Sequence, residues 1–439
     1  MSLAKRALSF MKRNGIGPTI TAVAERKDQK RMDAWQKRTL GYDHAIRPRS
    51  LFGEIKTVSD QELAAIRERE DILISILVPA YQTKKEYFCQ MIESVLGQSY
   101  PNWQLVIADS SSDDRLRQAA ESYKDPRICY HHLDLNEGIS QNTNEAFKWA
   151  EGNYVGLLDH DDLLAPQALS EVVRLLRQGG YDMVYTDEDK VSADLTGCFE
   201  PNIKPAFNLD LLLSNNYICH FTVIRSELFG KALLRKEYDG AQDYDLFLRI
   251  LIGIEWERVE KHKTTHEYGW FPVEYVKRHI GHVPMILYHW RAHEHSTSDN
   301  PESKRYAYEA GKRAVEDFFH QMDWDATITH SRHLGFYHAE YHPDIMTVRK
   351  DIDAVCGRSV RRGCVIKGPV MDGVHLFDGM NFRFSGYLHR AAMPLDVDQA
   401  PREVIKRRKR SSVRTSDRNA GQTEGRLVYL PDLFFREKG

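Results

Sequence analysis

Three carboxylates lie within one short stretch of the chain, Asp159-His160-Asp161-Asp162. The stretch directly follows an apolar run, residues 154–158, which has the composition of a buried strand. Acidic side chains are rarely buried without a partner, and their oxygens suit hard cations such as Mg²⁺ or Mn²⁺. The alternative is a polar loop that caps the next helix, since Asp is a favoured N-cap residue. Taken alone, the motif does not separate a cation site from a helix cap.

The segments around this motif alternate between short apolar runs and longer amphipathic stretches. We expect strands at residues 72–78, 104–108, 128–131, 154–158 and 183–186. We expect helices between them at residues 84–97, 113–124, 140–150 and 166–177. This alternation indicates βαβ units and an α/β fold with a mostly parallel sheet flanked by helices. Right-handed crossovers then bring the carboxyl ends of the strands to one edge of the sheet.

That edge of the sheet collects further acidic residues. Asp109 follows the second predicted strand, and Asp187, Glu188 and Asp189 follow the fifth. Open α/β sheets bind their ligands outside the carboxyl ends of the strands. Because several separate strand ends carry carboxylates, we favour a ligand and cation site over simple helix capping.

The composition of the 439 residues is that of a soluble globular protein, 42% hydrophobic and 28% charged. The formal net charge of −2 gives no support to a nucleic-acid partner. The six cysteines include no C-x-x-C pair, which favours reduced thiols and a cytoplasmic protein. There is no signal peptide pattern and no apolar run long enough for a membrane helix.

The length predicts three regions. They are a helical N-terminal extension at 1–70, an α/β domain at 71–322, and a small α+β accessory module at 323–439 with a mobile basic loop near 406–425. Residues 3–13 are basic and amphipathic, so they form either a solvated helix or a peripheral contact with an anionic membrane at its inner face. The five basic residues at 406–410 likewise form a solvated face or contact anionic lipid or phosphate.

Residues 72–320 resemble the inverting family 2 glycosyltransferases, whose GT-A fold has a mostly parallel Rossmann-like sheet. The segments that carry the resemblance are residues 75–81 as the opening strand, 136–144 as the nucleotide-side segment, 157–162 as the Asp-x-Asp motif, and Gln242-Asp243 where the family has Glu-Asp. A lone Asp-x-Asp is a weak signal, but the ordered set is specific. Residues 185–190 and 287–291 are similar to bacterial enzymes that build surface polysaccharides, including rhamnosyltransferase-like members of O-antigen and rhamnan pathways.

The resemblance implies transfer of a sugar from a nucleotide-diphosphate sugar, dTDP-rhamnose or a UDP-sugar, to a hydroxyl of a glycan or lipid-linked glycan. It implies Mg²⁺ or Mn²⁺ as Lewis acid on the diphosphate. Asp161 is the expected metal ligand, Asp159 contacts the ribose or the metal and its water, and His289 is the candidate third ligand. His289 has the alternative of a histidine at the edge of the core.

The resemblance also assigns the catalytic base and the diphosphate contact. Asp243 would take the proton of the acceptor hydroxyl on the face opposite the leaving group. Asp245, two residues later on the same predicted helix, points elsewhere and would pair with Arg249. Arg291 would hold the diphosphate through its paired donors, with a surface ion pair as the alternative.

The remaining implied contacts surround the nucleotide and the sugars. Asp109 would read the edge of the base, Tyr81 would stack on it or flank it, and Pro79 would also contact the nucleotide sugar. A helix cap for Asp109 and a packing tyrosine for Tyr81 are the alternatives. The other expected nucleotide-sugar contacts are Asn136, Gly138, Asn142, His160, Asp187 and Asp189. Two departures from the family pattern are Gln242, which removes a charge, and Thr143, where many members have Arg.

Two other functions compete with a sugar transferase. A sugar nucleotidyltransferase would need a Gly-rich, basic loop after the first strand, and this chain has Pro79-Ala80-Tyr81-Gln82-Thr83 there. A catalytically silent carbohydrate-binding or scaffold protein that keeps the fold is the second alternative, and the intact Asp159, Asp161 and Asp243 argue against it.

Overall fold

The computed structural model describes residues 3–27, 50–292, 305–385, 387–400, 402–408 and 426–436. The predicted basic loop near 406–425 therefore lies, from residue 409 onward, outside the described residues. In the described part of the chain, no helix is both long enough and apolar enough to cross a membrane.

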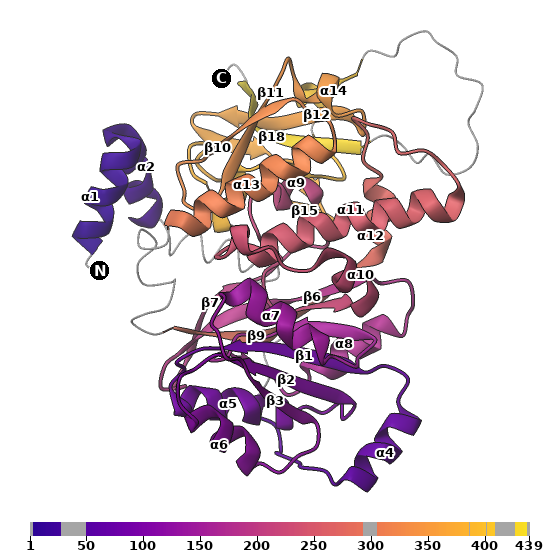
Figure 1. The fold of residues 1–439 in the computed structure, drawn as a ribbon. Coiled ribbons are helices and arrows are strands. Elements are labelled where there is room, and N and C mark those ends of the chain that lie inside the picture. Colours follow the sequence, from indigo (N-terminus) through magenta and orange to yellow (C-terminus); the bar gives the residue numbers. More distant parts are fainter. Residues whose placement is uncertain are drawn as a thin grey trace.

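A nine-stranded sheet forms the centre of the larger half of the molecule (Figure 1). Its strand order is β3-β2-β1-β4-β8-β6-β9-β5, with β7 paired to β6. The bounds are β1 Ile74–Ala80, β2 Trp103–Asp109, β3 Ile128–His132, β4 Tyr154–Leu157, β5 Leu163–Leu164, β6 Met183–Ser192, β7 Cys198–Asn202, β8 Thr222–Arg225 and β9 Ile280–Ala292. The first four strands are parallel, as predicted, but β8 runs antiparallel to both neighbours, so the sheet is mixed.

Helices cover both faces of this sheet, which explains why β1 and β2 are almost continuous apolar runs. Alternate residues of β1 belong to different cores, since Leu77 packs in one cluster while Ile76 and Val78 pack in the other. One face carries α5 Lys85–Leu96, α6 Arg115–Ser122 and α8 Ala168–Leu176. The other carries α7 Ile139–Lys148, α10 Ser226–Ala232 and the long α11 Gln242–His262.

Strand β6 is longer than predicted. We expected it to end at Asp187, but it continues to Ser192, so Asp187 and Asp189 lie within the strand and not after it. Residues 187–189 have the composition of a loop, because Asp and Glu are uncommon in strands. Here β6 is paired on both sides, with β9 and with β7, and its acidic side chains find partners on the neighbouring segments.

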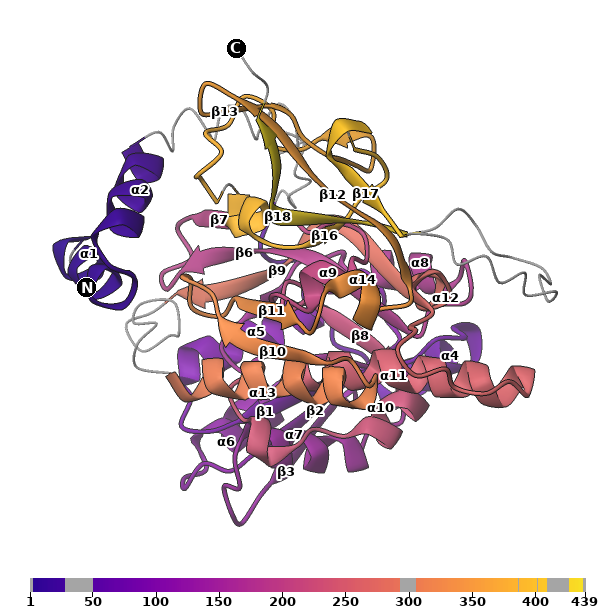
Figure 2. The same ribbon diagram turned by 90° about the horizontal axis from the view of Figure 1, so that it is seen from above.

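Further elements surround the sheet. They are α1 Leu3–Asn14, α2 Ile16–Lys27, α4 Asp60–Arg69, α9 Leu209–Leu212, α12 Val273–His279, α13 Arg305–Gln321 and α14 Ile345–Val348, with short 3₁₀ turns at Lys236–Tyr238, Tyr387–Ala392 and Arg402–Val404. The helix pair α1–α2 lies to one side of the molecule (Figure 1). Helices α11 and α13 lie side by side between the large sheet and the C-terminal strands (Figures 1 and 2).

The C-terminal tract is richer in strands than predicted. Its strands are β10 Ala326–His330, β11 Tyr337–Tyr341, β12 Ile352–Arg361, β13 Cys364–Lys367, β14 Val370–Met371, β15 Val374–His375, β16 Leu395–Asp396, β17 Ile405–Arg407 and β18 Arg426–Arg436. The sequence has strand-like patterns at 365–377 and 426–430 but no clear one for β12, which pairs with β13, β17 and β18 in a five-stranded sheet. The tract shares one continuous hydrophobic core with α11 and α13, because Tyr429 and Leu395 belong to the same cluster as Tyr244 and Phe318.

A buried ion cluster also joins the tract to the larger half. Arg349 is fully buried, and its guanidinium donates to Asp210 of α9 at 2.5 Å and to Asp351 at 2.7 Å. Arg426 of β18 pairs with the same two carboxylates and with Asp396. Burial alone would raise the pKa of Asp210, but the two guanidiniums outweigh it and hold that pKa below its ordinary value.

We predict that Arg349→Met destabilises the protein by about 3–5 kcal/mol, since it leaves buried carboxylates without their partner. The control Arg174→Met removes an exposed pair with Glu171 and should cost at most about 1 kcal/mol. Urea unfolding at pH 7 measures both values. Equal losses in the two variants would contradict the importance of the cluster.

The same cluster predicts a pH dependence. Because the pKa of Asp210 is lowered on folding, its contribution is present above its unfolded value of about 3.8 and disappears as the pH falls through the lower folded value. Unfolding titrations between pH 5 and pH 2 should therefore show a shallower acid loss in Arg349→Met than in the wild type.

Candidate active site

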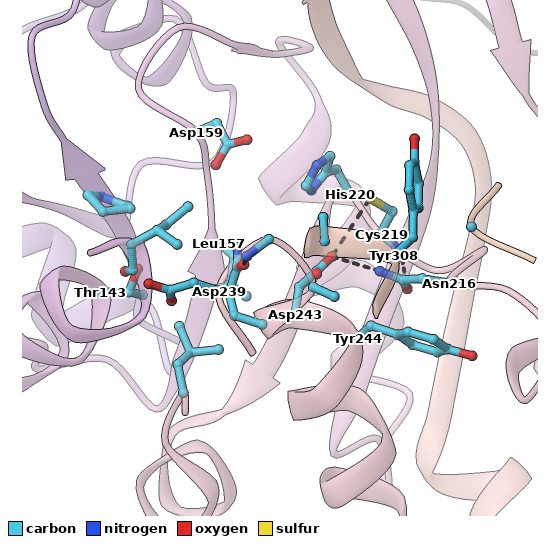
Figure 3. A pocket seen from close by; sticks show the side chains of 18 of the residues that line it. Thr143, Leu157, Asp159, Asn216, Cys219, His220, Asp239, Asp243, Tyr244 and Tyr308 are labelled. Atoms are coloured by element: carbon cyan, nitrogen blue, oxygen red, sulfur yellow. Dashed lines mark hydrogen bonds between the residues drawn. The ribbon is translucent and has the colours of Figure 1, made fainter. Parts of the chain in front are cut away.

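A cavity of about 600 Å³ opens where β4 ends and α11 begins (Figure 3). Of the predicted site residues, Pro79, Asp159 and Asp243 line it. Thr143, noted above as a departure from the family pattern, and Trp290 form further parts of the wall. The cavity therefore brings together the end of β4 and the start of α11. Asp159 and Asp243, which the two sequence motifs contribute, are 84 residues apart in the chain.

Asp159 carries poorly compensated negative charge into this cavity. Burial raises the pKa of its carboxyl above the ordinary value, and the nearby carboxylates of Asp161 and Asp243 raise it further. His220 opposes the shift. Neighbouring carboxylates repel one another when they are ionised, and a bound cation relieves this repulsion. Asp159 and Asp161 thus fit a hard divalent metal ion.

Asp162 has a different role from its two neighbours in the motif. It is 1% exposed, and it accepts hydrogen bonds from Tyr288 Oη at 2.5 Å and from the backbone N–H of Arg291 at 2.7 Å. Both partners belong to β9. Asp162 therefore ties the acidic loop after β4 to a neighbouring strand and fixes where Asp159 and Asp161 stand.

Arg291 contributes to the same tie. Its side chain is fully buried, donates from Nε to the Asp161 carbonyl at 2.6 Å, and stacks over the ring of Tyr87. Burial lowers the pKa of the guanidinium. Arg291 therefore holds the acidic loop through the Asp161 carbonyl and does not line the cavity. Its expected contact with a diphosphate stays a prediction.

Asp243 lies in the first turn of α11 and faces the cavity (Figure 3). Its Oδ2 accepts a hydrogen bond from Asn216 at 2.8 Å, and the Cys219 thiol lies 3.8 Å from the same oxygen. Asp245 points away, as predicted, and pairs with Arg249 at 2.7 Å and with Arg235. The two acids of this turn therefore have separate tasks.

Gln242, the residue that departs from the family pattern, has a local structural contact. Its Oε1 accepts a hydrogen bond from the backbone N–H of Gly240 at 2.8 Å and so closes the turn before α11. A neutral amide makes this bond as well as a carboxylate does.

His289 is not a partner of Asp159 and Asp161 in this structure. Its Nδ1 lies 2.6 Å from Asp189 Oδ1 because β6 and β9 pair these two residues directly. Among the described residues, one group of three or more potential metal ligands has all its ligand atoms within 4.8 Å, and it consists of Asp189, Cys198 and His289. The predicted trio of Asp159, Asp161 and His289 is therefore not assembled, since strand register directs the histidine to β6.

The residues predicted to bind the base do not line the cavity. Asp109 is fully buried, with Oδ1 accepting from the Ser111 N–H at 2.8 Å and Oδ2 from Tyr130 Oη at 2.6 Å. Tyr81 is 49% exposed. The Asp109 bonds shape the turn that follows β2.

The predicted nucleotide-side segment is held by its own hydrogen bonds. Asn136 Oδ1 accepts from Asn142 Nδ2 at 3.1 Å and from the Gly138 N–H at 3.2 Å. Gly138 has a φ of +101°, a conformation that favours glycine, and the side chain of Asp239 fills the space where a Cβ would stand. This segment forms the start of α7.

Asp187 and His160 are also bonded within the protein. Asp187 Oδ1 lies 2.9 Å from His282 Nε2 and accepts from the Lys204 N–H at 2.9 Å. His160 Nδ1 lies 2.9 Å from Thr83 Oγ1. None of these residues lines the cavity.

The cavity contains polar residues that sequence reasoning missed, namely Asn216, Cys219, His220 and Asp239 (Figure 3). Asp239 Oδ1 accepts from the Ser140 N–H at 3.2 Å, at the start of α7. The Asp239-Gly240 pair is a turn signal just before Asp243 and is the one sequence feature that could have identified this position. The other three lie in an irregular segment before β8, where no periodic pattern identifies them.

Comparisons with known proteins show which family the chain resembles. A family model described as glycosyl transferase family 2 matches residues 75–239. The protein y4gI of Sinorhizobium fredii, described only as uncharacterised, is 38% identical over 250 residues, which cover 56% of this chain and 25% of y4gI. This chain thus spans about a quarter of the length of that relative.

Two further likenesses extend the comparison. WcaA of Escherichia coli, named a putative colanic acid biosynthesis glycosyl transferase, is 30% identical over 204 residues, which cover 44% of this chain and 72% of WcaA. Residues 1–349 of TarS from S. aureus, solved with UDP-GlcNAc, match with a TM-score of 0.42 and 18% identity over 56% of this chain and 66% of that one. The predicted fold class and family are confirmed, and the chain belongs to glycosyltransferase family 2.

Proposed function

We propose that this protein is a metal-dependent inverting glycosyltransferase that moves a sugar from a nucleotide-diphosphate sugar to a hydroxyl of a glycan, in the synthesis of a bacterial surface polysaccharide. Family membership and the name of WcaA support the reaction class and the polysaccharide role. The observation that carries the proposal is one cavity into which Asp159 and Asp243 both project from different elements. Such a cavity has room for a cation and diphosphate on one side and a base on the other.

In this proposal Asp243 is the general base. Inversion requires a group opposite the leaving group that takes the acceptor proton as the hydroxyl attacks. Among the described residues, both side-chain contacts of Asp243, from Asn216 and Cys219, reach Oδ2. These contacts fix the carboxylate and leave Oδ1 to receive the proton.

Asp159 and Asp161 are the proposed holders of Mg²⁺ or Mn²⁺. Their carboxylate oxygens match the preference of hard cations, and the raised pKa of Asp159 marks negative charge that a cation would balance. A bound metal would supply Lewis-acid stabilisation to the departing diphosphate. Asp162 and Arg291 would hold the loop so that both oxygen ligands keep their positions.

The donor is dTDP-rhamnose or a UDP-sugar in this proposal, and the acceptor is a glycan or lipid-linked glycan. Trp290 is half-buried in the cavity wall and offers an apolar face to a sugar ring. The exposed Leu8 and Met11 of α1 lie near Lys12 and Arg13, a pattern that supports peripheral contact with an anionic membrane.

We predict that Asp243→Asn keeps donor binding but lowers kcat by about 10²–10⁴-fold, the usual contribution of a general base. The matched control is Glu260→Gln, which makes the same chemical change at an exposed position of the same helix and should leave turnover intact. Donor binding by calorimetry and sugar transfer with a panel of nucleotide sugars measure the two effects. Unimpaired transfer by Asp243→Asn would exclude it as the base.

Metal removal tests the second half of the proposal. We expect EDTA to abolish transfer and Mn²⁺ or Mg²⁺ to restore it. Asp161→Asn should raise the Mn²⁺ concentration needed for half-maximal rate by tenfold or more, about 1.4 kcal/mol or above, because one charged ligand is lost. Full activity in EDTA-treated protein would rule out a metal-dependent enzyme.

A further inference from the structure

A second cavity lies between α2, the β10–β11 hairpin and the five-stranded C-terminal sheet. Its volume is about 730 Å³. Gly17, Pro18 and Thr21 of α2 form one wall, and the remaining walls come from residues 329–338, 382–384 and the strands β12 and β18. None of the residues assigned above to sugar transfer lines this cavity.

The walls of the second cavity are basic. They contain three arginines, Arg332, Arg358 and Arg383, against the single carboxylate of Asp432. His330, His333 and His338 add further nitrogen donors. Three permanent positive charges around one hollow favour a negatively charged ligand.

Arg358 gives the strongest structural evidence for a bound anion. It is 6% exposed, and its Nη2 donates to the Phe382 carbonyl at 2.7 Å. Its Nε and Nη1 are buried and find no hydrogen-bond acceptor in the part of the chain that the structure describes. Buried guanidinium donors without acceptors are costly, so their retention indicates a ligand that supplies the oxygens.

The histidines report a positive potential near this cavity. Burial lowers the pKa of His333 to about 3, with His389, Arg332 and Arg13 lowering it further. Burial also lowers the pKa of His389 to about 4, and Arg332 adds to that effect. The two rings are stacked with centroids 3.5 Å apart, and their lowered pKa values favour the uncharged form of both rings at neutral pH.

The same cavity also has aromatic walls. Phe382, Phe384 and Phe434 line it, and Met393 adds an apolar thioether. Aromatic faces beside polar groups suit a ligand with an apolar ring surface, such as the face of a pyranose. The chemistry of the walls therefore matches a sugar that carries a negative charge.

Tyr337 links this cavity to the proposed active site. Its side chain is 4% exposed, contributes to the walls of both cavities, and donates a hydrogen bond to the Tyr308 carbonyl at 3.0 Å. Tyr308 is itself part of the active-site wall. The two cavities are therefore neighbours, with the side chain of Tyr337 standing between them.

We propose that the second cavity binds an oxyanion, a phosphate or a carboxylate, carried by the acceptor glycan. Arg358 and Arg332 receive the anion, Arg383 closes the site from the exposed side, and the phenylalanines contact the sugar that bears it. The role as an acceptor site rests on the proposed transferase function, whereas anion binding itself does not.

The test uses the full-length protein in EDTA, so that no metal assists the donor cavity. Calorimetry measures binding of inorganic pyrophosphate and, separately, of glucuronate, with glucose as the neutral reference. We expect one of the two anions to bind and glucose not to bind. Arg332→Ala and Arg383→Ala should each weaken that binding about tenfold to hundredfold, the effect of losing a charge-assisted hydrogen bond.

Two matched controls separate this site from other sources of binding. Arg361→Ala removes an exposed arginine at the end of β12, outside the cavity, and should leave the dissociation constant unchanged. Asp159→Asn alters the active-site cavity and should also leave it unchanged. Arg358→Lys keeps a positive charge at the buried position and should weaken binding while the protein stays folded by circular dichroism.

The outcomes distinguish the sources of the anion. Tight pyrophosphate with weak glucuronate indicates a phosphate-bearing acceptor, and the reverse indicates a uronate-bearing one. Absence of binding by both anions, or binding that survives Arg332→Ala and Arg383→Ala, overturns the proposal. Anion binding that depends on these arginines in a protein that transfers no sugar would instead refute the transferase function and keep the site.

Discussion

The cost of removing carboxylates from water separates the structural acids of this protein from those of its proposed cation site. Most buried acids in the described chain have a nearby donor, as Asp162 does with Tyr288 and Asp210 does with Arg349. Each such partner offsets part of the cost of burying the carboxylate, and the resulting bond gives the acid a structural role. Asp159 differs, because it lines the cavity, where burial raises the pKa of its carboxyl, His220 opposes the shift, and Asp161 and Asp243 add to it. The proposed site is the place where neutralisation within the protein is left incomplete.

The structural acids do the positioning. Asp162 bonds to β9 through a side chain and a backbone N–H, so the acidic loop has one conformation relative to the sheet. Asp245 bonds to Arg249 and Arg235, which anchors the first turn of α11 and leaves Asp243 facing the cavity. The proposed catalytic acids Asp159 and Asp243 are thereby positioned by Asp162 and Asp245, which have no proposed part in the reaction.

Sequence patterns predicted the first four strands of the sheet and the helices between them. Strands β1 to β4 and their helices are apolar runs or clear amphipathic stretches, so their bounds matched within a few residues. The extension of β6 was missed because Asp187 and Asp189 are strand residues only when His282 and His289 stand beside them. Asn216 and His220 were missed for a similar reason. They lie in an irregular segment, and no local sequence pattern predicts which residues such a segment contacts in the folded chain. Register, unlike periodicity, is a tertiary property.

The C-terminal tract has a closer relation to the active site than an accessory module would need. Its core is continuous with that of α11, which carries Asp243, and the ion cluster around Arg349 fixes its position against α9. Tyr337, the first residue of β11, forms a wall of the active-site cavity and of the basic cavity. A shift of this tract would therefore change the shape of both cavities at once. Under the proposed function, the tract would contribute to selection of the acceptor while the larger half holds the donor.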